Sequence, residues 1–256
     1  MLRNIAASLA SMRGSGRSAW LQSFFTPAAV ERFDVPAAQQ QSNFLQDFFR
    51  KHQPPEAAVA HYSSIDWTRK ILDNEMYTPM PFFPRFFNGL TGENRFLATI
   101  VNTDATIPHV LALRLKDLQT PEPHTPSASE LETETVAGPA SDRPFEVLCL
   151  MRLNPGLASH ASVVHGGFQA VIFDEVMRLV VLLHYNNICR LGPKRKQVTA
   201  GMTISYARPV LCPSDVLAKG RLVRREGRKW FMEAEIVDST GAVLTRADSV
   251  WVTARS

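Results

Sequence analysis

Four successive segments in the C-terminal half of the chain alternate apolar with other residues, and this pattern constrains the fold most. The alternation runs through residues 198–206, 216–222, 230–236 and 245–251. A period of two is the signature of strands with one buried face. Glu226–Gly227 and Ser239–Gly241 supply turn-forming residues between the last three segments. We therefore expect four sequential antiparallel strands here.

A further strand and a long helix precede these four segments. Residues 145–151 alternate in the same way, and a helix of about 18 residues fits Gly167 to Leu183 or His184. Apolar side chains cover most of the circumference of that helix: Phe168, Val171, Ile172, Phe173, Val176, Leu179, Val180 and Leu183. A helix that is apolar nearly all round is buried. The pattern predicts an α+β fold in which an antiparallel sheet curls around one central helix.

The N-terminal third has a different texture. Helical spacing of phenylalanines and leucines predicts helices within residues 40–75, and residues 77–88 interleave aromatics with prolines, which favours a packed loop. A strand is expected at residues 95–101, with a possible continuation at 109–115. Residues 119–141 are rich in Pro, Ser, Thr and Glu and lack aromatics, so we expect a flexible insertion.

The first 30 residues contain Arg3, Arg13 and Arg17, several serines and no acid. Such composition is typical of mitochondrial transit peptides, although an ordinary disordered N-terminus would look similar. We expect a leader at residues 1–30, a helical and aromatic extension at 31–88, and the main domain at 89–256. The expected location is the mitochondrion, and otherwise the cytoplasm.

Composition argues against several classes of protein. No apolar run reaches the roughly 18 residues of a membrane span, so stable membrane insertion is not expected. The three cysteines form no C-x-x-C pair, which disfavours a disulfide framework or a structural zinc site. The net charge of +4 comes without a recognisable nucleic-acid-binding motif, so nucleic acid is not an expected partner.

The helix start carries the first candidate site residues, His165, Gly166 and Gly167. Free N–H groups at a helix N-terminus carry partial positive charge and can hold an anion. Paired glycines let a ligand approach the backbone closely. An oxyanion formed during acyl transfer needs such donors. His165 is interpreted as orienting the substrate or a backbone group, or alternatively as a simple turn residue.

Two acids, Asp174 and Glu175, lie in the middle of the buried helix. A buried carboxylate is costly unless it is paired with an arginine or used in chemistry. As a functional group it would activate water or attack as a nucleophile. Thr199, early in the next strand, has a hydroxyl suited to orient the water or the carboxylate. Asp174 is favoured over Glu175, which projects about 100° away on a helix.

Helix geometry predicts how the site is assembled. Gly167 and Asp174 lie on nearly the same helix face but about 10 Å apart along the axis, so one carbonyl cannot touch both in a single chain. Two antiparallel copies of the helix about a two-fold axis would bring Gly167 of one beside Asp174 of the other. We expect a homodimer with shared active sites, possibly a dimer of dimers.

His165-Gly166-Gly167, Asp174-Glu175, residues 199–202, residues 206–209 and residues 226–229 occur in an order that resembles the PaaI-type acyl-CoA thioesterase superfamily. Within it, the chain is most similar to the mitochondrial thioesterase-superfamily-member-four-like branch and its fungal relatives. The resemblance covers roughly residues 143–253. It implies a hotdog fold, with catalytic residues Asp174, Gly167, His165, Gly166 and Thr199.

The resemblance also implies that an acyl-CoA is hydrolysed to a carboxylic acid and coenzyme A, with no metal and no cofactor beyond the coenzyme A of the substrate. Candidate substrate-binding residues are Glu175, Arg195, Lys196, Arg228 and Lys229, the basic ones meeting phosphates or merely being solvated. A hotdog enoyl-CoA hydratase and a non-catalytic acyl-CoA-binding regulator are alternatives. The insertion, Arg178 and His184 depart from the family pattern.

Overall fold

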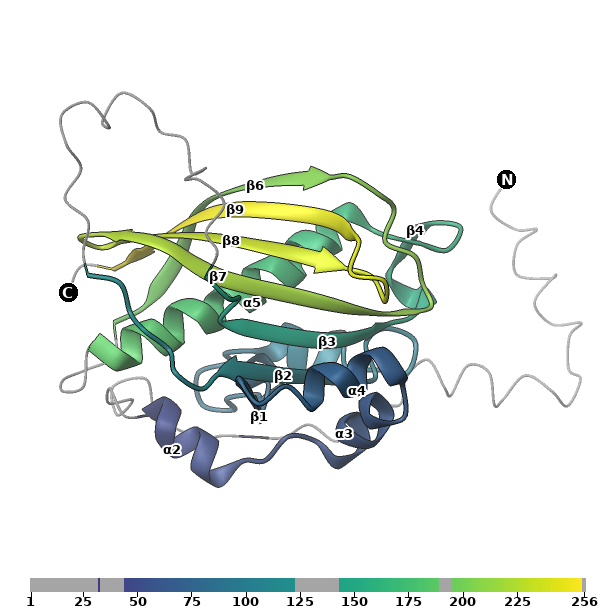
Figure 1. Cartoon of the computed structure of the whole chain (residues 1–256), viewed down its shortest axis with the longest axis horizontal. Coiled ribbons are helices and arrows are strands. Elements are labelled where there is room, and N and C mark those ends of the chain that lie inside the picture. The colour runs from purple at the N-terminus through teal and green to yellow at the C-terminus, as the bar shows by residue number, and fades with distance from the viewer. Residues whose placement is uncertain (1–31, 33–43, 123–142, 189–194, 255–256) are drawn as a thin grey trace, which may run out of the picture.

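The structure, a computed structural model, describes residue 32 and residues 44–122, 143–188 and 195–254 (Figure 1). The expected leader and most of the expected insertion at 119–141 lie outside the described residues. None of the described helices is long and apolar enough to cross a membrane.

One seven-stranded antiparallel sheet dominates the fold (Figure 1). In spatial order its strands are β1 (Tyr77–Met80), β2 (Val110–Leu115), β3 (Val147–Leu153), β7 (Ser214–Glu226), β8 (Lys229–Val237), β9 (Val243–Thr253) and β6 (Gln197–Tyr206). Two short strands, β4 (Ala158–His160) and β5 (Val163–Val164), pair with each other. The five strands predicted from alternation are therefore confirmed as β3, β6, β7, β8 and β9.

The long helix α5 (Gly166–Ile188) runs across the concave side of this sheet and contacts β3, β6, β7 and β8. Twelve of its side chains are buried, and Phe173, Val176 and Leu179 are fully enclosed. Gly220 in β7 permits the close approach, because a Cβ there would lie 3.1 Å from Val176. The predicted central helix is confirmed, and it is longer than expected, with 23 residues.

The N-terminal segment forms three short helices, α2 (Phe44–Lys51), α3 (Glu56–Ser63) and α4 (Asp66–Leu72). The aromatic segment packs as expected, because Phe82, Phe83 and Phe86 are each 1% exposed. The Phe48 ring stands edge-on to Phe83 and Phe86 at 5.1 and 4.7 Å. The segment is not entirely loop, since it starts with β1 and includes the short helix η2 (Phe83–Arg85).

The prediction of a strand at residues 95–101 is wrong, because the structure has a wide helical turn there, η3 (Phe96–Ile100). Leu97, Ala98 and Val101 are buried while Phe96 and Ile100 are exposed, which is helical spacing rather than alternation. The preceding Asn94 adopts φ 64° and donates side-chain hydrogen bonds to the carbonyls of Phe83 and Phe86. These hydrogen bonds fix Asn94 at the point where the helical turn begins. The suggested continuation is confirmed as β2.

Candidate active site

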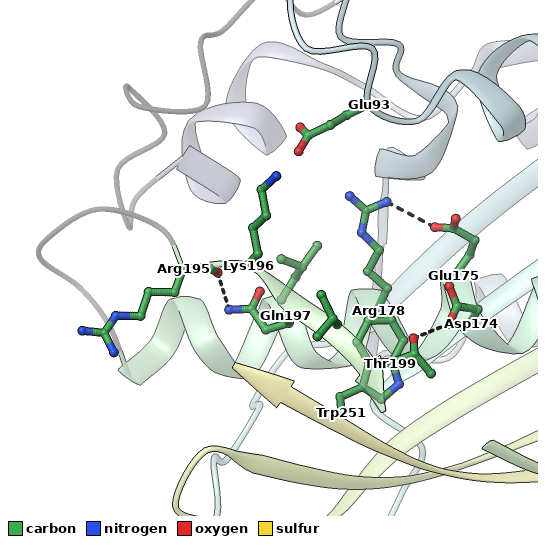
Figure 2. Close-up of a pocket in the computed structure, with 11 residues that line it drawn as sticks. Glu93, Asp174, Glu175, Arg178, Arg195, Lys196, Gln197, Thr199 and Trp251 are labelled. Atoms are coloured by element: carbon green, nitrogen blue, oxygen red, sulfur yellow. Dashed lines mark hydrogen bonds and ion pairs between the residues drawn. The ribbon is translucent and has the colours of Figure 1, made fainter. Parts of the chain in front are cut away.

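Asp174 faces the start of β6 from the middle of α5. The Thr199 hydroxyl donates a 2.5 Å hydrogen bond to Asp174 Oδ1 (Figure 2). Among the described residues no other group donates a hydrogen bond to Asp174, so its Oδ2 stays available. The structure thus joins two predicted site residues that are 25 positions apart.

A cavity of about 350 Å³ opens beside this pair (Figure 2). It combines three acids with three bases and a mixed wall: Glu93, Asp174, Glu175, Arg178, Arg195, Lys196, Leu182, Gln197, Val198, Thr199 and Trp251. Besides Asp174, four of the predicted site residues line this cavity. Glu175 comes from α5, Thr199 from β6, and Arg195 and Lys196 from the segment just before β6. A cavity with both charges can accept a polar, anionic substrate next to a free carboxylate oxygen.

Glu175 is in a different electrostatic situation from its neighbour. Burial raises the pKa of Glu175, an effect opposed by Arg178 and strengthened by the nearby charge of Asp174. Arg178 Nη1 lies 3.4 Å from Glu175 Oε2 and donates a 2.8 Å hydrogen bond to Asn94. Glu175 is therefore occupied with a pairing that ties α5 to the loop before η3. Arg178, which departs from the pattern expected from the sequence resemblance, is the residue that forms this ion pair and also contacts Asn94.

Trp251 on β9 was not singled out from the sequence, where it is one of several inward-facing strand residues. It pairs with Thr199 across the β6–β9 ladder, which brings it to the cavity wall. Its indole Nε1–H is buried and has no hydrogen-bond partner in the described part of the chain. A buried unsatisfied donor that lines a cavity is suited to bind a ligand or a water molecule. The register of β6 against β9, which the sequence does not reveal, would have shown that Trp251 lies opposite Thr199.

The helix start is arranged differently from the expectation. The Gly167 N–H donates a 2.9 Å hydrogen bond to His165 Nδ1, so the histidine ring already caps this donor. The N–H groups of Phe168 and Gln169 both reach the His165 carbonyl. The Gly166 N–H has no partner among the described residues. Within one chain, the helix-start N–H group left free is consequently that of Gly166, and His165 serves as the helix cap.

Neither glycine lines the Asp174 cavity, so a single chain does not bring the helix start to the carboxylate. Tyr206 instead donates a hydrogen bond to the Gly166 carbonyl at 3.1 Å. A Cβ at Gly167 would lie 3.1 Å from the His165 ring. A larger residue at this position would require the His165 ring to shift by a few tenths of an ångström.

The basic residues divide into two groups. Arg195 and Lys196 line the cavity, whereas Arg228 and Lys229 do not. Arg228 is used by the backbone, since its Nη1 donates a 2.8 Å hydrogen bond to the Thr253 carbonyl. Within the described ranges, no group of His, Cys, Asp and Glu side chains is arranged to hold a metal ion.

Comparison with known proteins identifies the region that contains this site. Residues 161–245 match the family model described as the thioesterase superfamily. This stretch includes the helix start, Asp174 and Thr199. No curated protein sequence matches the chain.

Solved structures with similar folds are distant. A hypothetical thioesterase with coenzyme A from Streptococcus pneumoniae is 18% identical, covering 46% of this chain and 86% of its own, with a TM-score of 0.38. Zebra fish thioesterase superfamily member 2 is 16% identical over 44% of this chain and 78% of its own, TM-score 0.38. The E. coli PaaI protein is 13% identical over 43% and 73%, TM-score 0.36. Residues 161–245 of this chain, which include the candidate site, are therefore similar to the thioesterase superfamily.

Proposed function

We propose that the protein hydrolyses an acyl-CoA to a free carboxylic acid and coenzyme A. The observation that carries the proposal is the Asp174 carboxylate, held by Thr199 through one oxygen while the other is free beside a charged cavity. The family match supports the reaction class. Exposed Arg195 and Lys196 at the cavity supply the cations that coenzyme A phosphates prefer.

In this proposal Asp174 Oδ2 removes a proton from water, which attacks the thioester carbonyl. The tetrahedral intermediate then collapses, the carbon–sulfur bond breaks, and coenzyme A leaves as a thiol after it takes up the proton. Alternatively Oδ2 attacks the carbonyl itself, the carbon–sulfur bond breaks and coenzyme A leaves as a thiolate that takes up a proton from water. Water then hydrolyses the resulting mixed anhydride to the carboxylic acid and regenerates Asp174. In both routes the oxyanion accepts a hydrogen bond from a helix-start N–H, for which Gly166 is the free donor.

A second copy of the chain would complete the site. Gly166 and Asp174 are eight positions apart on one helix, about 12 Å along the axis. Strand β6 is the last strand of the described sheet, and Val198 and Tyr206 on it are 50% and 54% exposed. An exposed, apolar edge strand is prone to pair with another chain. Pairing about a two-fold axis would set Gly166 of the partner subunit beside Asp174.

The substrate class is tested by thiol release from acyl-CoAs of increasing chain length, with wild type and Asp174→Asn. The matched control is Asp238→Asn, because Asp238 lies in an exposed turn away from the cavity. We expect release by wild type and by the control, and its loss in Asp174→Asn. Binding of acyl-CoA without any release would contradict the proposal in favour of a silent regulator. Hydration of crotonyl-CoA instead of thiol release would favour a hydratase.

The shared site is tested by mixing two inactive variants, Asp174→Asn and Gly166→Pro, which lacks the N–H. Exchange of subunits would give mixed dimers in which one of the two sites is intact, so part of the activity should return. A fully active monomer in analytical ultracentrifugation would contradict the dimer. Such a monomer would leave the role of Asp174 untouched.

A further inference from the structure

A second cavity, of about 320 Å³, lies between α3, the aromatic segment and the start of β2. It shares no lining residue with the Asp174 cavity. Much of its wall is apolar, including Ala57, Phe82, Phe86 and Val110, and one guanidinium, that of Arg85, belongs to it. Its volume is at the lower end of ligand pockets, which span roughly 300–1,000 Å³.

Arg85 is held in place by neutral acceptors only. Its Nη1 donates to the Asn102 side chain, and its Nη2 donates a 2.7 Å hydrogen bond to the Ile107 carbonyl. The Nε–H is buried and has no hydrogen-bond partner among the described residues. No described carboxylate forms an ion pair with Arg85, although Asp104 lines the same cavity. The guanidinium is therefore fixed in position and lacks a counter-charge.

A desolvated cation without an anion is energetically costly. The cost shows in the ionisation of the side chain, since burial lowers the pKa of Arg85 to about 10. Arg85 stays charged at neutral pH, and its charge is not neutralised by an ion pair with any described carboxylate. Carboxylates are the anions that best match a guanidinium, because both are planar and share several hydrogen-bond directions.

We propose that this cavity is a binding site for a small carboxylate with a short apolar tail. The carboxylate pairs with the positive charge of the Arg85 guanidinium, and the tail lies among Phe82, Phe86 and Val110. The His109 ring lines the cavity as well, and burial together with His61 holds the pKa of His109 below its usual value. A neutral His109 adds a hydrogen bond without a competing charge. The inference stands on this cavity and not on the reaction at Asp174.

Isothermal titration of the full chain with hexanoate tests the site, with hexanamide as the neutral probe of the same shape. Three variants are compared with wild type: Arg85→Gln, which keeps an amide donor but removes the charge; Ala57→Trp, which fills the mouth; and Arg69→Met as control. Ala57 is exposed on α3, so the bulky substitution leaves the core intact. Arg69 is an exposed arginine of α4 that pairs with Asp66.

We expect saturable binding of one hexanoate by wild type and by Arg69→Met, and at least tenfold weaker binding of hexanamide. Arg85→Gln and Ala57→Trp should each weaken hexanoate binding at least tenfold. Should Arg85→Gln fail to fold, Ala57→Trp decides alone. The inference is overturned if hexanoate does not bind, if hexanamide binds equally well, or if both variants bind like wild type. Asp174→Asn should bind hexanoate at this site as wild type does, whatever its activity.

Discussion

Two carboxylates, one on α5 and one bonded to a side chain of α5, occupy opposite kinds of environment. Glu146, before β3, is 2% exposed and accepts hydrogen bonds from Arg143, His184 and the Leu222 N–H at 2.9, 2.7 and 2.8 Å. Asp174 accepts one hydrogen bond, from Thr199, and borders a cavity. Both oxygens of Glu146 are used, because Oε1 accepts from Arg143 and Oε2 accepts from His184 and Leu222. The difference teaches that a saturated acid holds the fold, whereas an acid with a free oxygen can do chemistry.

His184 belongs to the saturated region. It is fully buried, its Nε2 meets Glu146, and its Nδ1 lies 2.9 Å from the Thr120 hydroxyl. Both ring nitrogens are therefore bonded, and they fasten the C-terminal half of α5 to the sheet. These two contacts account for a polar side chain at the buried position 184.

The largest effect is expected from Glu146→Ala. This change leaves His184 buried without its partner and should reduce the free energy of unfolding by about 3–5 kcal/mol. Urea denaturation measures it, with exposed Glu56→Ala as control. Because the Asp174 cavity is separate, activity per folded molecule should be unchanged. A normal unfolding midpoint would show that the saturated acid is dispensable.

Thr199→Val tests the open region next. Without its hydroxyl donor, Asp174 loses orientation, and we expect kcat for thiol release to fall about 10–100-fold, equivalent to roughly 1.4–2.7 kcal/mol. Thr199→Ser, which keeps the hydroxyl, should restore most of the rate. If the valine variant matched wild type, the hydrogen bond would have no part in the reaction.

Trp251→Phe should have a smaller effect. The substitution keeps an aromatic ring in the core, removes the unpaired indole N–H and leaves a small void, because phenyl is smaller than indole. Loss of one neutral hydrogen bond to a ligand or water is worth about 0.5–1.5 kcal/mol, so kcat/KM should fall roughly 2–10-fold. Steady-state kinetics on the best acyl-CoA measures this. An unchanged kcat/KM would place the indole outside the binding site.

Glu175→Gln tests how the charge of a partly buried acid on α5 affects the stability of the fold. The pKa of Glu175 is raised above its ordinary 4.5, chiefly by burial, so the native state prefers the protonated form. Wild type and variant should be equally stable below pH 4.5, where both carry a neutral group. As pH rises through the raised pKa, wild type loses stability relative to the variant. Thermal melts across pH test this, and a variant less stable at pH 7 would show that the Arg178 pair outweighs burial.

The sequence predicted the framework better than the details of the site. Alternation located β3 and β6 to β9, because one buried face per strand leaves a direct mark on composition. Spacing could not reveal the turn at 96–100, since the anchoring hydrogen bonds of Asn94 are tertiary. A strand partner, rather than any local motif, brings Trp251 to the cavity.

For the candidate site too, the sequence indicated which residues take part better than it indicated their contacts. Asp174, Glu175, Thr199, Arg195 and Lys196, which the sequence suggested as site residues, line one cavity. The capture of the Gly167 N–H by the His165 ring was not foreseen, because it depends on a side-chain rotamer. Arg228 and Lys229 lie outside the cavity. The sequence could not predict this, because positive charge in a hairpin does not indicate which way the side chains face.

The most direct test of the difference between the two acids is thiol release and urea denaturation measured together on Asp174→Asn and Glu146→Ala. We predict that Asp174→Asn unfolds at the wild-type midpoint while its kcat falls about 10²–10⁴-fold, the range for loss of a general base. Glu146→Ala should show the reverse, a lowered midpoint with a normal rate per folded molecule. A wild-type rate in Asp174→Asn would contradict the assignment of the active site.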